Sequence, residues 1–126
     1  MKILYISSNG GIHDYRFLEK LVRDFEVLFL HYSSVDMIDE IRYLKKLKIV
    51  SKKPLLRSFP LISELFHFKR IYKEFKPDII HSGYVLQVWI LPSLLNIHAH
   101  LSMVWGSDVL IINYNNLCMF IIRNLK

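Results

Sequence analysis

Two stretches of the chain each lead a short apolar run into a loop that carries polar residues. The first covers residues 76–83 (KPDIIHSG) and the second covers residues 103–110 (MVWGSDVL). Each run has the length of a buried strand, and the apolar segment between them is long enough for one helix. A strand–helix–strand unit places both strand ends at the same edge of a sheet, where open α/β sheets bind their ligands. The pair therefore predicts a parallel α/β fold with a ligand site at that edge.

A second unit of this kind is expected in the first third of the chain. Residues 2–7 are almost all apolar, which is usual for a parallel strand buried on both faces. After a break at residues 8–11, Asp14 can cap a helix. The apolar side chains of this helix fall at i, i+3, i+4 and i+7, as Leu18, Leu21, Val22 and Phe25. A strand over residues 26–31 completes a β–α–β unit, for which a right-handed crossover is expected.

The remaining elements follow from apolar spacing and from prolines. Pro77 ends the helix before it, because the residue preceding a proline is driven out of the helical region. In chain order we expect a helix within residues 36–46, a strand at 47–50, a loop over 52–60, a helix over 61–75, strands at 78–81 and 101–105 with a helix over 85–95 between them, and a last helix from Asn115 or Asn116. The prediction is an α/β, Rossmann-like parallel sheet with helices on both faces.

Composition narrows the class of protein. A chain of 126 residues, 52% of them hydrophobic and 22% charged, suits one globular domain over residues 1–126. The single Cys118 excludes an internal disulfide and a cysteine-based metal cluster, which favours a reducing compartment. We expect no signal peptide, and no window reaches the roughly 18 uncharged apolar residues of a membrane span. The expected location is the cytoplasm.

The charge balance indicates anionic partners. The net charge is +6, which suits phosphates or acidic lipid head groups. No motif supports a nucleic-acid partner, so none is expected. Residues 44–57 mix six basic side chains with leucines and an isoleucine. This mixture suits peripheral contact with the inner face of a membrane, each basic group contributing up to ~1 kcal/mol, although a solvated charged face is the more ordinary explanation.

The turn after the first strand is a candidate anion site. Asn9 is followed by Gly10 and Gly11, and two glycines let backbone N–H groups approach an anion at a helix N-terminus. The full G-x-G-x-x-G pattern is missing, so a simple tight turn is the alternative. His13 lies at the mouth of this turn, where it can meet a phosphate or an acceptor hydroxyl, or be an ordinary surface residue.

The second candidate group follows the two strands described first. His81 ends a strand beside Gly83, and such a histidine is either structural or part of a site. The sequence Gly106-Ser107-Asp108 brings one hydroxyl and one carboxylate to the same edge. Its carboxylate can orient a substrate hydroxyl or cap a turn.

The spacing of residues does not support a metal site, a nucleophilic triad or a pair of catalytic carboxylates. His98 and His100 alternate along one stretch but have no carboxylate nearby in sequence, so no metal site is expected. There is no Ser-His-Asp order, nucleophile elbow or pair of carboxylates. The catalytic residues are therefore unknown at this stage.

These motifs resemble a known family. The segment MKILYI with Gly10 and Gly11, the segment KPDIIH at 76–81 and the segment WGSDV at 105–109 occur in the order found in the N-terminal domain of family 4 (group 1) glycosyltransferases of the GT-B fold. The resemblance covers essentially the whole chain. It implies two Rossmann-like domains facing a cleft, with the acceptor held by the N-terminal domain and most of the nucleotide-sugar by the C-terminal one. It also implies a sugar transfer that retains the anomeric configuration, with the nucleotide-sugar as co-substrate and without a metal or other cofactor.

The resemblance also assigns site residues. Gly10 and Gly11 would lie against the donor diphosphate, while His81 and the loop 106–108 would line the cleft near the acceptor, with His13 and Trp105 beside them. Many relatives carry a histidine where this chain has Trp105, so no catalytic histidine is transferred to that position. The donor-binding half with its paired glutamates is absent from these residues. The domain is therefore expected to be incomplete.

Two hypotheses follow. The first is the acceptor-side domain of a sugar transferase that acts on a glycan or lipid-linked acceptor in polysaccharide biosynthesis. Alone it would be inactive and bind nucleotide-sugar weakly or not at all, unless a separate chain supplies the donor domain against the apolar residues 117–125. A truncated reading frame is equally compatible. The second hypothesis is a non-enzymatic, flavodoxin-like nucleotide-binding or regulatory module, which a nucleotide would stabilise against heat.

Overall fold

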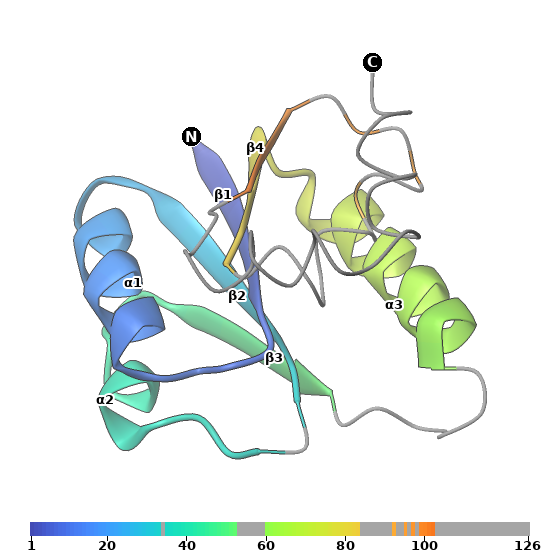
Figure 1. Cartoon of the computed structure of the whole chain (residues 1–126). Helices are drawn as coiled ribbons and strands as arrows, with labels where there is room; N and C mark the ends of the chain where they lie inside the picture. The colour runs from blue at the N-terminus through green and yellow to red at the C-terminus, as the bar shows by residue number, and fades with distance from the viewer. Residues whose placement is uncertain are drawn as a thin grey trace, which may run out of the picture.

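The computed structural model of the protein describes residues 1–33, 35–52, 60–83, 92, 95, 97 and 99–102. In these ranges the strands form one five-stranded sheet in the order β3-β2-β1-β4-β5, and every neighbouring pair is parallel (Figure 1). The strands are β1 (Lys2–Ser7), β2 (Glu26–Tyr32), β3 (Lys48–Lys52), β4 (Ile79–Ser82) and β5 (His100–Ser102). The helices are α1 (Ile12–Asp24), α2 (Asp39–Arg42) and α3 (Pro60–Phe75). The predicted Rossmann-like α/β class is confirmed.

Helices cover both faces of the sheet. Successive side chains of a strand point to opposite faces, so the core divides into two clusters. On one face, α1 and α2 pack on the sheet through Leu18, Val22 and Ile41. On the other face α3 packs through Phe68, Ile71 and Phe75. Figure 1 shows α1 and α3 on opposite sides of the strands. This double cover explains why β1 and β2 are apolar along nearly their whole length.

The order of the strands creates a switch point. The chain passes from β1 to β2 and β3 in one direction, and then returns to place β4 on the other side of β1. Register is continuous across this junction, since Ile3, Leu4, Tyr5 and Ile6 pair with the residues from Ile79 to Ser82. In open α/β sheets the carboxyl ends of the strands beside such a reversal form a ligand crevice. The loops after β1 and β4 flank that position here.

The helix predicted within residues 36–46 is much shorter than expected. It covers only Asp39–Arg42, because Ile38 has an extended backbone and its N–H donates to the Gly10 carbonyl at 3.0 Å. At the other side, Lys46 adopts a positive φ of 72°, which a helix does not allow. The hydrogen bond to Gly10 therefore prevents the longer helix that the apolar spacing predicted.

The other differences are smaller. The predicted strand at 47–50 is present as β3. It extends to Lys52, a residue that the prediction placed in a loop. β4 ends at Ser82 rather than at His81, and β5 begins at His100. The predicted helix over 85–95, apart from positions 92 and 95, lies outside the described residues. So do the end of the strand at 101–105 and the last helix.

Candidate functional site

The loop after β4 is in direct contact with β1 and with the first turn of α1 at the carboxyl edge of the sheet. The Gly83 N–H donates to the Ile6 carbonyl at 2.9 Å, which continues the pairing of the two strands into the loop. A Cβ atom at Gly83 would stand 3.1 Å from the Tyr5 hydroxyl oxygen and 3.2 Å from Asp14 Oδ1. Only a residue without a side chain leaves this approach unobstructed. The fold thus joins two segments that lie about seventy residues apart in the sequence.

Asp14 lies at the centre of this contact. Its side chain is 4% exposed and accepts three hydrogen bonds. The Tyr5 hydroxyl donates to Oδ1 at 2.7 Å, while the Ser7 hydroxyl and the Gly10 N–H donate to Oδ2 at 2.9 and 2.8 Å. The prediction that Asp14 caps α1 was wrong, because Gly11 is the N-cap and Asp14 is the third helical residue. Its carboxylate points toward β1, where the buried hydroxyls of Tyr5 and Ser7 need a hydrogen-bond acceptor.

The sequence held a signal for this cluster that was missed. Tyr5 and Ser7 are two residues apart, so their hydroxyls share one face of an otherwise apolar strand. Buried hydroxyls need hydrogen-bond partners. An acidic residue in the first turn of the next helix is the nearest candidate in the sequence.

The glycine turn is built differently from the prediction. Gly10 has a φ of +62°, and a Cβ there would stand 2.7 Å from Met37 Cβ and 3.0 Å from His31 Nε2. Two of the amides in the turn have internal partners, since Asn9 N–H donates to Ser7 Oγ and Gly10 N–H to Asp14. An anion would therefore bind through the amides that follow, at the N-terminus of α1, where backbone N–H groups lack helical partners.

His31 reaches the underside of this turn and was not singled out from the sequence. It is 1% exposed, its Nδ1 lies 3.3 Å from Ser51 Oγ, and its Nε2 has no hydrogen-bond partner of good geometry in the described structure. Burial lowers the pKa of His31, while the charges of Asp14 and Asp36 and the backbone of the turn oppose this shift. His31 is therefore a neutral imidazole at pH 7.

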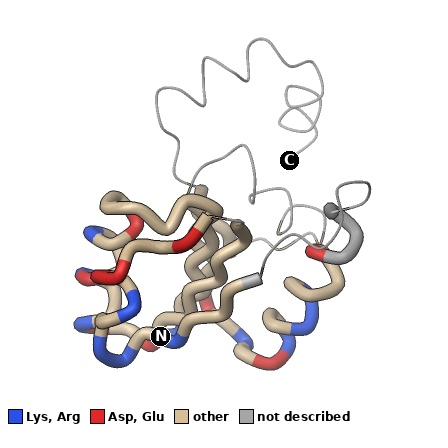
Figure 2. The backbone as a smooth tube through the Cα atoms, turned by 90° about the horizontal axis from the view of Figure 1, so that it is seen from below, with Lys and Arg blue, Asp and Glu red and all other residues tan. Residues whose placement is uncertain are grey.

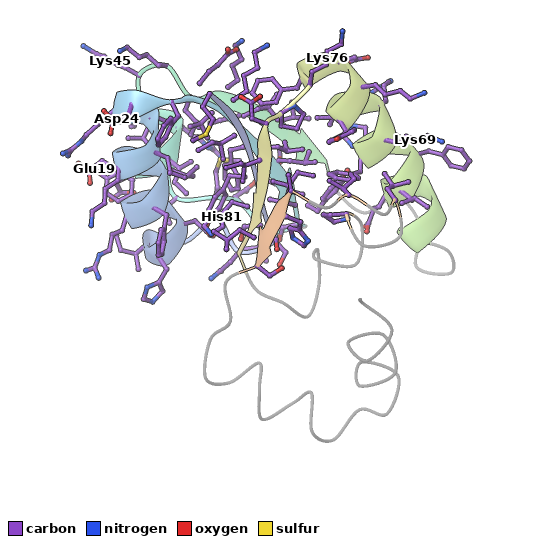
Figure 3. The ribbon with its side chains drawn as sticks, turned by 90° about the horizontal axis from the view of Figure 1, so that it is seen from above. Glu19, Asp24, Lys45, Lys69, Lys76 and His81 are labelled. Atoms are coloured by element: carbon purple, nitrogen blue, oxygen red, sulfur yellow. The ribbon has the colours of Figure 1, made fainter. Side chains whose placement is uncertain are left out.

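His81 lies at the end of β4, beside the same cluster (Figure 3). Its ring is half-buried and packs edge-to-face on Tyr5, with the ring centroids 5.0 Å apart, and on Phe17 at 6.0 Å. Burial lowers its pKa, and the charge of Asp14 opposes the shift. A neutral imidazole at this edge can exchange hydrogen bonds with a substrate hydroxyl.

The other predicted site residues are either exposed beside the cluster or outside the described part of the chain. His13 is exposed in the first turn of α1, one residue before Asp14. The residues Trp105, Gly106, Ser107 and Asp108 lie outside the described part of the chain, as does His98. The structure therefore connects the Gly10–Gly11 turn with His81 through Asp14 and Tyr5, and places His31 against Gly10 and Gly83 against Asp14.

His100 has a structural environment on the opposite face of the sheet. Ser82 Oγ lies 2.9 Å from His100 Nε2 and 2.9 Å from Ser102 Oγ, and Ser102 Oγ lies 3.1 Å from the same nitrogen. Burial, with a smaller contribution from His81, lowers the pKa of His100 to about 4. Within the described ranges, no three His, Cys, Asp or Glu side chains lie close enough together to hold a metal ion.

Of the basic segment 44–57, the structure describes residues 44–52, which run from one edge of the sheet to the other. Lys45 and Lys46 are exposed in the loop before β3, at the amino edge of the sheet, and Lys48 donates to Glu26 at 2.7 Å. The strand then carries the chain to Lys52 at the carboxyl edge. In Figure 3, Lys45 and Lys76 lie at one end of the sheet and His81 toward the other, and Figure 2 shows charges on helices and loops around largely uncharged strands. No helix among the described residues is long and apolar enough to cross a bilayer.

The strand order, the glycine turn after β1 and the histidine at the end of β4 define a class. They are the features of a Rossmann-like domain with a ligand edge at its switch point. A family model described as glycosyl transferase 4-like matches residues 2–124. The chain therefore belongs to the glycosyl transferase 4-like family, as its motifs predicted. No curated protein matches it in a sequence search.

Proposed function

We propose that this chain is the acceptor-side domain of a retaining glycosyltransferase. It would move a sugar from a nucleotide-sugar to a glycan or lipid-linked acceptor. The observation that carries the proposal is the arrangement at the switch point, where Asp14 accepts from the Gly10 N–H and Gly83, after β4, lies close to Asp14, in a chain of this family. A half-buried neutral histidine and a helix N-terminus face the same edge, and together they suit a sugar hydroxyl and a diphosphate.

Each part of the site has a role in this proposal. The amides at the start of α1, beyond Gly11, would face the donor diphosphate, and His13 would stand at the mouth of the same turn. His81 would contact the acceptor, together with the loop of Trp105 to Asp108 that the family resemblance places in the cleft. The transfer would need no metal or other cofactor, and no residue is assigned as catalytic.

Most of the nucleotide-sugar would be held by a second domain. We infer that these residues alone bind the donor only weakly and do not catalyse transfer without that domain. It would come from a longer form of the chain or from a separate chain.

Titration of the ¹⁵N-labelled chain with UDP-glucose tests the proposal. At millimolar concentrations we expect chemical-shift changes at the amides of Gly10, Gly11, His81 and Gly83, while calorimetry detects no tight binding. Titration with sodium sulfate at equal ionic strength controls for general anion effects. Sub-micromolar binding would show that a complete donor site is present, and shift changes confined to other residues would contradict the assigned edge.

A lipid-linked acceptor would bring the domain to a membrane. Peripheral contact at the inner face is part of the proposal, and the exposed Lys45 and Lys46 are the basic groups suited to it. Cosedimentation with phosphatidylglycerol vesicles tests this contact. If the same fraction of protein sediments with neutral vesicles as with phosphatidylglycerol vesicles, the result argues against this contact.

A further inference from the structure

We propose that Asp14 is a positioning residue of the transfer site, because its carboxylate binds the turn after β1 and lies close to Gly83 in the loop after β4. The inference rests on the proposed function, since it concerns the spacing of the amides and the histidine that would meet donor and acceptor. Asp14 is itself 4% exposed, so it would act through these groups and not by contact with the substrate.

The hydrogen bonds of Asp14 support this role. Its three donors come from the middle of β1, the end of β1 and the turn, at Tyr5, Ser7 and Gly10. Oδ1 also faces Gly83 closely enough that a methyl group there would stand 3.2 Å away. One carboxylate thus fixes the turn after β1 by hydrogen bonds and limits by close contact how the loop after β4 can approach it.

The charge of Asp14 distinguishes positioning from a direct electrostatic effect on the ligand. In the described part of the chain, Asp14 forms no ion pair with a lysine or arginine, so its burial depends on hydrogen bonds alone. Burying a carboxylate is unfavourable unless it is fully hydrogen-bonded. A negative charge below the turn also repels a diphosphate. Any benefit to diphosphate binding must therefore come from the geometry that the carboxylate imposes.

The charge and the geometry of Asp14 therefore predict opposite changes in UDP affinity when the carboxylate is replaced. Removing the charge by Asp14→Asn keeps the shape of the side chain but weakens the charge-assisted hydrogen bonds. If Asp14 acts by positioning, the variant binds UDP roughly fivefold more weakly than the wild type, despite the loss of repulsion. If its effect on the ligand is only electrostatic, the variant binds UDP more tightly. Asp24→Asn, at the exposed end of the same helix, is the matched control and is expected to bind as the wild type does.

The measurement is a titration with UDP, followed at the amides of Gly11 and His13 by ¹⁵N NMR. In the free Asp14→Asn protein we also expect shifted resonances for Gly10 and Gly83, which Asp24→Asn leaves in place. Binding of UDP to Asp14→Asn that is equal to or tighter than binding to the wild type would overturn the inference. So would unchanged Gly10 and Gly83 resonances.

A second variant covers the case in which Asp14→Asn does not fold. Tyr5→Phe removes one donor and leaves the carboxylate, and it is expected to weaken UDP binding in the same direction; unchanged binding would count against the positioning role. The two proposals fail differently. A wild-type chain in which UDP shifts no amide at the turn contradicts the proposed function and the role of Asp14 with it. Wild-type binding that Asp14→Asn leaves unchanged overturns only the role of Asp14.

Discussion

At the scale of single residues, Gly10 is the position where the backbone of the site is most constrained. Its φ of +62° is unfavourable for other residues, and the space where a Cβ would lie is filled by Met37. The carbonyl of Gly10 also fixes the start of α2, and its N–H is bonded to Asp14. A change at Gly10 therefore disturbs three elements together.

We expect Gly10→Ala to lower the free energy of unfolding by about 2–4 kcal/mol, from backbone strain and overpacking together. Gly11→Ala is the matched control. Gly11 has a negative φ of −96°, and the atoms nearest to a Cβ there belong to Asn9, at 3.5 Å or more, so we expect a change below about 1 kcal/mol. Urea unfolding measures both. Equal effects at the two positions would show that the close contact with Met37 does not restrict Gly10.

His100 gives a prediction for the dependence of stability on pH. Its pKa is about 4 in the folded protein and about 6.5 when unfolded, so the unfolded chain takes up the proton first as the pH falls. The free energy of unfolding should therefore decrease between pH 6.5 and pH 4. Replacing His100 by Asn removes this contribution. The stability advantage of the wild type over the variant should therefore shrink as the pH falls from 6.5 to 4. A difference that stays constant with pH would contradict the lowered pKa.

At the scale of elements, the sheet and its helices depend on alternation and apolar spacing. α3 shows this within one turn, because Phe68 is fully buried against the strands while Phe66 is 70% exposed. α2 shows the limit of the same reasoning. Its apolar spacing favoured a longer helix, but a single hydrogen bond from Ile38 to Gly10 and the positive φ of Lys46 confine it to four residues.

The two phenylalanines of α3 form a matched pair for a test of packing. Phe68→Ala leaves a cavity between α3 and the sheet, and we expect it to lower the free energy of unfolding by about 3–5 kcal/mol. Phe66→Ala should change it by less than about 0.5 kcal/mol, because its side chain buries little surface. Chemical denaturation followed by circular dichroism compares them. A large loss from Phe66→Ala would mean that this exposed ring has a partner in solution.

At the scale of the whole molecule, strand order decides where a ligand can bind. The apolar runs predicted the strands and their parallel direction, and the family motifs predicted that β1 and β4 both lead to the site. The position of β4 beside β1 follows from the packing of both helical layers, and it creates the switch point between them. Lys45 and Lys46 lie away from the site, because β3 carries the chain from them at the amino edge to Lys52 at the carboxyl edge.

Local patterns and motif order were enough to predict the α/β class, the strand runs, the glycine turn and the glycosyltransferase family. Three features could be seen only in the folded chain: Gly83 lies against β1 and Asp14, His31 lies against Gly10, and Asp14 binds the Gly10 turn close to Gly83 instead of capping a helix. These features depend on hydrogen bonds and close contacts between distant residues. Such contacts form only after the strands are paired and their polar groups are buried, so no spacing within one segment predicts them.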